Sequence, residues 1–129
     1  MAMTIQQISK AIGYERWKMH GSAHTDASLA IVREIAAMKE RTLPKDGRLI
    51  LFGSQARGDA TLESDWDLLM LLNKDSIEHS DFARYAYPFV ELGLTHGEYF
   101  SIKQYTVDEW EERKSTPFYK NVKKEGVEI

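Results

Sequence analysis

Residues 49–72 read LILFGSQARGDATLESDWDLLMLL, and this stretch decides the fold. Apolar letters open and close it, and the polar connection between them begins with Gly53 and Ser54. Strands in the middle of a sheet that helices cover are apolar at nearly every residue. The stretch therefore predicts a buried strand at 48–53, a glycine–serine turn, and a second buried strand at 66–72.

Two aspartates, Asp65 and Asp67, stand where the second predicted strand begins. Residues two apart in an extended strand point to the same face, so the two carboxylates should lie side by side. Neighbouring carboxylates repel each other unless a cation neutralises them, and Mg²⁺ is the usual hard partner of carboxylate oxygens. The structural alternative is that Asp65 caps the turn and Asp67 is a solvated strand residue. Because strands disfavour Asp, we predict a metal-binding pair.

The turn before this pair has the chemistry of a phosphate site. Gly53 lets the backbone approach a ligand without a Cβ, and Ser54 offers a hydroxyl and an N–H to a phosphate oxygen. A helix that begins here would add further unpaired N–H groups. The alternative is an ordinary strand-to-helix turn. Arg57 has two open interpretations, since it can neutralise a phosphate or pair on the surface with Asp59 or Glu63.

Together these segments resemble the signature of the polymerase-beta-like nucleotidyltransferase superfamily, and more closely its small stand-alone members, the minimal nucleotidyltransferases. The likeness is carried by Gly53-Ser54-x-Ala56-Arg57-Gly58 followed by Ser64-Asp65-x-Asp67-Leu68-Leu69, and it extends into residues 109–127. It implies an α/β (α+β) nucleotidyltransferase fold. In this fold a small mixed β-sheet has helices packed mainly on one face, and the other face is open as the floor of the active site.

The resemblance also implies an activity. The expected reaction moves a nucleoside monophosphate from a nucleoside triphosphate, with ATP expected first, to a hydroxyl of a protein, a nucleic acid or a small molecule, and releases pyrophosphate. In the family, two aspartates hold the divalent ions, so Asp65 and Asp67 are the implied catalytic and metal-binding residues, with two Mg²⁺ ions. The nucleotide-binding residues that it implies are Gly53, Ser54, Arg57 and Ser64.

A third carboxylate is expected on the third strand, at 98–105, and Glu98 is the only acid there. Alternation places Glu98 on the apolar face of that strand, whereas Tyr99, Ser101 and Lys103 form the polar face. Tyr99 falls at the position where the family carries its acid. Two alternatives stay open: a twist at the start of the strand brings Glu98 round as a catalytic acid, or the third carboxylate is missing and transfer is slow or absent.

Helices are expected around these strands. Apolar residues at helical spacing predict one helix over 4–20 and a second that begins near Thr25 or Asp26 and ends before Pro44. A third is predicted over 77–92, bent or interrupted near Pro88, because proline removes a helix hydrogen bond.

The C-terminal part carries clear stop and start signals. The glycines of 93–97 should break the third helix. Thr106 and Glu109 have the spacing of a capping box, and Pro117 and Gly126 fit the first turn and the end of a final helix. We expect one domain over 1–129, made of an N-terminal helical segment, the catalytic sheet region and C-terminal helices, at 1–45, 48–105 and 106–129.

Composition limits the class of protein. The chain has 129 residues, of which 43% are hydrophobic and 29% charged, as in an ordinary soluble domain. It has no cysteine, which excludes disulfides and thiolate metal sites and fits a reducing cytosol, so a cytoplasmic location is expected. No apolar run approaches the roughly 20 residues that cross a membrane. The net charge of −3 gives no strong signal of nucleic-acid binding.

Two classes of function remain. The chain has no room for a separate acceptor-binding domain. The acceptor of such an enzyme is therefore expected to be another macromolecule, or to be bound by a protein partner or by the second copy in a homodimer. The second class is a regulatory protein, such as the antitoxin of a toxin–antitoxin pair that binds a small helical ribonuclease and is weakly active or inactive. Minimal nucleotidyltransferases often occur in such pairs. A missing third acid and an exposed apolar patch would favour this alternative.

Overall fold

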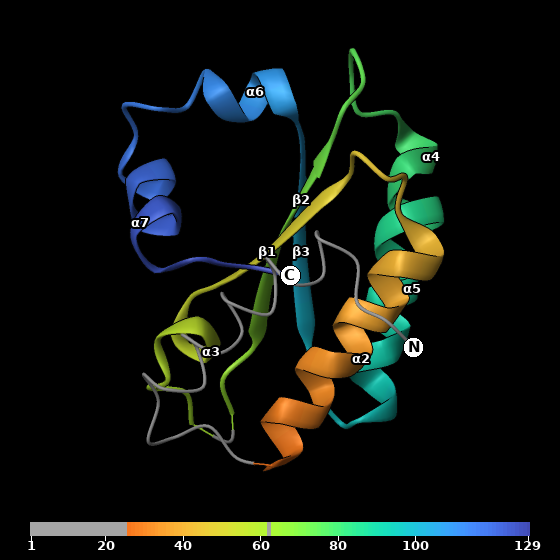
Figure 1. Ribbon diagram of the computed structural model, residues 1–129, viewed down its shortest axis with the longest axis vertical. Helices are drawn as coiled ribbons and strands as arrows, with labels where there is room; N and C mark the ends of the chain where they lie inside the picture. Colours follow the sequence, from red (N-terminus) through yellow and green to blue (C-terminus); the bar gives the residue numbers. More distant parts are fainter. Residues whose placement is uncertain (1–25, 62) are drawn as a thin grey trace, which may run out of the picture.

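The computed structural model describes residues 26–61 and 63–129, which form a mixed sheet with helices (Figure 1). The helix expected over 4–20 lies outside the described residues. No helix in the described part of the chain is both long and apolar enough to span a bilayer. The elements are α2 (Asp26–Thr42), β1 (Arg48–Phe52), α3 (Ser54–Arg57), β2 (Trp66–Leu72), α4 (His79–Asp81), η1 (Phe82–Ala86), α5 (Tyr87–Thr95), β3 (Phe100–Thr106), α6 (Val107–Glu111), α7 (Pro117–Glu125) and β4 (Val127–Glu128).

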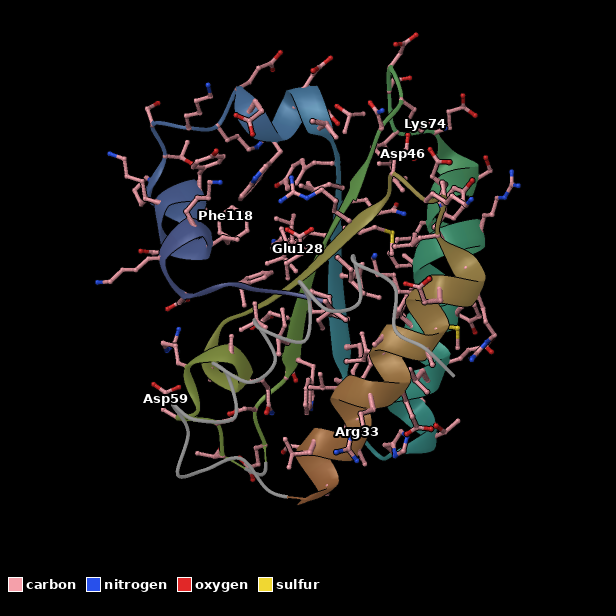
Figure 2. The ribbon with its side chains drawn as sticks, in the orientation of Figure 1. Arg33, Asp46, Asp59, Lys74, Phe118 and Glu128 are labelled. Atoms are coloured by element: carbon pink, nitrogen blue, oxygen red, sulfur yellow. The ribbon has the colours of Figure 1, made fainter. Side chains whose placement is uncertain are left out.

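The four strands lie in the order β3-β2-β1-β4. Strand β2 is parallel to β3, whereas β1 is antiparallel to both β2 and β4. This is the small mixed sheet of the predicted fold class. Strand β4 was not predicted, because two residues carry no readable period. It pairs with the outer edge of β1, and its residue Glu128, labelled in Figure 2, forms a salt bridge of 2.8 Å with Arg48 of β1.

Side chains on the two faces of the sheet form two separate cores. Trp66, Leu68 and Met70 belong to the core that α2 and α5 cover. Leu69 and Leu71 belong to the second core, beneath α6 and α7. Burial on both faces explains why β2 is apolar at almost every residue. The long helices lie on one face as expected, and the two short C-terminal helices cover part of the other (Figure 1).

The segment predicted as one helix over 77–92 is built in three pieces, and it runs on to Thr95. A π-helical turn, Phe82–Ala86, comes directly before Pro88, which lies in the first turn of α5. Proline has no N–H and its ring clashes with the carbonyl four residues earlier, and a wider turn accommodates both defects. Gly93 does not break the helix as predicted. It lies inside α5, and a Cβ there would come within 2.7 Å of the Phe100 ring.

Replacing Gly93 by alanine should therefore destabilise the protein, although alanine is the better helix former. Overpacking costs roughly 1–3 kcal/mol and helix propensity returns about 1 kcal/mol. We expect the free energy of unfolding, measured by urea denaturation, to fall by roughly 1 kcal/mol. In a Phe100→Leu background the same change should be neutral or stabilising. An equal change in the free energy of unfolding in both backgrounds would show that the Phe100 ring does not press on residue 93.

Candidate active site

Asp67 lies near the start of β2, which is one of the two inner strands of the sheet. Its register partners are Phe52 on β1 and Ser101 on β3. Asp67 is the one residue of β2 that is not fully buried. Its Oδ2 lies so close to Gly53 that a Cβ on this glycine would collide with the carboxylate. The turn after β1 and the predicted metal-binding residue are therefore in direct contact.

Burial and neighbouring charges both act on the carboxyl group of Asp67. Burial raises the pKa of Asp67 above its ordinary value, and the neighbouring charge of Asp65 raises it further. Lys103 and Arg57 act in the opposite direction and lower the pKa of Asp67. The two aspartates predicted to share a face are thus close enough to repel each other. A bound cation would relieve that repulsion.

The turn between the strands is one helical turn bracketed by two glycines. Gly53 has a φ of 75° and Gly58 a φ of 84°, both in the region that favours glycine. The carbonyl of Gly53 accepts hydrogen bonds of 3.1 Å from Ala56 N–H and 3.0 Å from Arg57 N–H. Ser54 is the first residue of α3, and its hydroxyl makes no hydrogen bond to any residue that the structure describes. That hydroxyl is available to a ligand.

Arg57 pairs on the surface, as one of its two interpretations predicted. Its Nε lies 3.2 Å from Asp59 Oδ2, and its Nη1 lies 3.1 Å from Glu125 Oε1 at the end of α7. The second partner, 68 positions away in the chain, was not predicted. Because its charge still lowers the pKa of Asp67, Arg57 also contributes positive potential to the site.

Ser64 supports the connector that leads to the aspartate pair. Its hydroxyl accepts a hydrogen bond of 2.8 Å from Thr61 N–H. Its carbonyl oxygen accepts one of 3.4 Å from the side chain of Gln55, which belongs to α3. Ser64, the residue before Asp65, is thereby held against the helical turn.

Glu98 is not brought together with the aspartate pair. Strand β3 begins two residues later than predicted, so Glu98 lies before it, and its N–H donates to Gly93 O at the end of α5. The residue beside the start of β2 is Tyr99, whose carbonyl accepts 2.9 Å from Trp66 N–H. Tyr99 is 71% exposed. Within residues 26–61 and 63–129, no group of three or more acids, histidines or cysteines could hold a metal ion.

The sequence-based site omitted two side chains on the same face of the sheet. Lys103 pairs in register with Leu69, two residues along from Asp67, and it is exposed. Its Nζ lies 5.8 Å from the ring centre of Phe118, which packs edge-on against Phe52 at 5.4 Å. Alternation along β3 predicts Lys103 on the polar face, but nothing in the sequence indicates that Phe118, labelled on α7 in Figure 2, packs against it.

The residues present fit a Mg²⁺ site of the open kind. Asp65 and Asp67 supply hard oxygen donors, and a bound cation would offset both the desolvation of Asp67 and its repulsion by Asp65. Mg²⁺ keeps several waters and is commonly held by one or two carboxylates together with phosphates of the substrate. Two protein carboxylates are therefore sufficient when the remaining ligands come from a nucleotide.

Comparison with known proteins identifies a family. Residues 32–128, more than half of the chain, match the family model described as a nucleotidyltransferase domain. The matched segment contains every strand of the sheet and the whole of the candidate site. No curated protein and no solved structure gives a significant match.

The contact between Gly53 and Asp67 can be separated from backbone strain with a double-mutant cycle. Gly53 has a φ of 75° and a ψ of −159°, a region that essentially only glycine adopts, so alanine there is strained whatever lies beside it. A Cβ at this position would also collide with Asp67 Oδ2. We therefore expect Gly53→Ala to lower the free energy of unfolding, measured by urea titration, by more in the wild type than in an Asp67→Ala background, which keeps the backbone strain and removes the carboxylate. Equal losses in the two backgrounds would contradict the contact.

Proposed function

Since the chain belongs to the nucleotidyltransferase domain family, we propose that it is a Mg²⁺-dependent enzyme that moves a nucleoside monophosphate from a triphosphate to a hydroxyl acceptor. The observation that supports this most is the contact of Asp67 with the Gly53 turn. It sets a carboxylate pair directly beside a backbone turn with a free serine hydroxyl. Metal and phosphate ligands are thereby adjacent, as a metal-bound nucleotide requires.

The residues have distinct roles in this proposal. Asp65 and Asp67 hold Mg²⁺, which neutralises charge on the phosphates when it is bound. The missing Cβ of Gly53 leaves space for the Asp67 carboxylate beside the turn. Ser54 donates its hydroxyl to a phosphate oxygen. Arg57 adds positive potential while its ion pairs with Asp59 and Glu125 hold it in place.

The chemical step is an exchange of one phosphate ester for another. The acceptor hydroxyl oxygen forms a bond to the α-phosphorus, and the bond from that phosphorus to the bridging oxygen of the β-phosphate breaks. The electron pair leaves with pyrophosphate. Because Glu98 does not reach the pair, the acceptor proton passes to water rather than to a third carboxylate, and we expect turnover to be slow for this reason.

The acceptor is a hydroxyl of a separate macromolecule. Asp65 and Tyr99 are exposed beside the site, and the described residues provide no additional domain that could enclose a small acceptor. A large partner can present its hydroxyl at such an open face without being enclosed. ATP is the proposed donor nucleotide.

A second proposed function is regulatory binding of a protein, as in a toxin–antitoxin pair. Its support is a set of exposed large apolar side chains on η1 and α5, which are Phe82, Tyr87 and Leu94, with 43%, 48% and 54% of their surface accessible. Co-purification from the source cell, comparing the wild type with a Tyr87→Ser/Leu94→Ser variant, tests it. A stoichiometric partner lost only in the variant supports binding through this surface, and a wild-type protein that purifies alone contradicts it.

Asp67→Asn should have opposite effects in the absence and presence of ligand. Without ligand the variant should melt higher than the wild type. The raised pKa of Asp67 means that its ionised form destabilises the folded state at neutral pH, and asparagine carries no charge. Thermal melting without added metal or nucleotide measures this. A variant that melts lower than the wild type would contradict the unfavourable burial of this charge.

With Mg²⁺ and ATP the order should reverse. A ligand at a hundredfold excess over its Kd stabilises the folded state by about 2.7 kcal/mol. We expect that gain in the wild type and in Asp75→Asn, an exposed aspartate beyond the far end of β2, and not in Asp65→Asn or Asp67→Asn. No Mg²⁺-dependent gain in the wild type at millimolar ATP, GTP, CTP and UTP would refute the proposed enzyme.

A further inference from the structure

Lys103 is a cation on the face of the sheet that carries the aspartate pair. Strand β3 runs parallel to β2 with Ser101 opposite Asp67 and Lys103 opposite Leu69. Alternation therefore directs Ser101 and Lys103 to the same face as Asp67.

The ammonium group of Lys103 is not used by the fold. Arg48, Arg57 and Lys74 all form ion pairs with carboxylates. Lys103 forms none with residues 26–61 or 63–129, and its one recorded contact is the face of the Phe118 ring at 5.8 Å. A cation over an aromatic ring at an exposed position is stabilised by only about 0.5–1 kcal/mol. The ring supports the lysine stem without neutralising its charge.

The position of this charge relative to the turn indicates its ligand. Asp67 lies on β2, between Gly53 at the end of β1 and Lys103 on β3. A phosphate chain bound to metal on the aspartate pair would have the backbone turn on one side and the ammonium group on the other. Lysine is a compact point charge with three donors, which suits the distributed charge of a phosphate chain.

We propose that Lys103, on the polar face of β3, binds the phosphate chain of the nucleoside triphosphate. Strand β3 carries no carboxylate on this face. This inference rests on the proposed function, because it assigns a further ligand at the same site. Arg57 is less suited to this role, since Asp59 and Glu125 already engage its guanidinium. Lys103 thus acts as a substrate-binding residue, and its charge attracts phosphate without the metal, in addition to the hydroxyl of Ser54.

Binding of a non-hydrolysable ATP analogue with Mg²⁺, measured by calorimetry, tests the assignment. We expect Lys103→Gln to weaken binding by roughly tenfold or more, as for loss of a charge-assisted hydrogen bond. Lys103→Arg should retain part of the affinity because it keeps the charge. Lys120→Gln, an exposed lysine on α7, is the matched control and should bind like the wild type. Mn²⁺ affinity without nucleotide should not fall in Lys103→Gln, because the change removes a positive charge near the aspartate pair, and the melting temperature without nucleotide should change little.

The outcomes separate this inference from the proposed function. A wild-type protein that does not bind the analogue refutes both. If the wild type binds it and Lys103→Gln binds equally well, only the role of Lys103 is refuted. A Lys103→Gln variant that loses Mn²⁺ affinity or melts several degrees lower would show that the lysine supports the structure of the site, which also overturns the assignment to phosphate.

Discussion

Burial of β2 on both of its faces constrains where this protein can carry charge. Taking a carboxylate out of water costs several kcal/mol unless it is compensated. Six of the seven residues of β2 are buried, and Asp67, near the end where the cover stops, is the exception. The turn after β1 reaches the same end because β1 and β2 are antiparallel. The site therefore forms where the helices on the second face leave the sheet uncovered.

The parts of the fold that follow from local chemistry could be predicted from the sequence. The two apolar strands, the capping box at Thr106 and the final helix that starts at Pro117 are confirmed. Alternation of side chains along an extended strand predicts that Asp65 and Asp67 lie on the same face. Their role as metal ligands stays a prediction, as does the nucleotide-binding role of Ser54.

The features that were missed depend on distant parts of the chain or on small shifts. The pairing of Arg57 with Glu125 joins residues that no local pattern relates. The position of Glu98 depends on where β3 begins, and a difference of two residues decides whether it belongs to the strand. The π-helical turn before Pro88 is a widening of a single turn, which the proline indicates only as a place of interruption. Glycine in a sequence predicts a helix break at position 93, and the contact with Phe100 that requires glycine there is tertiary, so the sequence does not reveal it.

The second core shows how the C-terminal helices are held on the sheet. Its aromatic rings meet edge-on or tilted, with Trp110 at 5.6 Å from Phe118 and 4.7 Å from Tyr119. Such pairs contribute roughly 0.5–1.5 kcal/mol beyond the area that they bury. They orient α6 and α7 relative to each other and thereby set Phe118 below Lys103. The aromatic packing of the C-terminal segment thus reaches the edge of the candidate site.

The two edge strands of the sheet determine whether two molecules can pair strand to strand. A long, flat outer strand is a template for pairing with another chain, and charged side chains or very short strands prevent this. On one side the outermost strand is β4, which has two residues and ends in Glu128, whose carboxylate pairs with Arg48 of β1. On the other side β3 carries an exposed lysine in its middle. Both borders therefore resist intermolecular strand addition, so the same lysine that faces the candidate site also guards against aggregation.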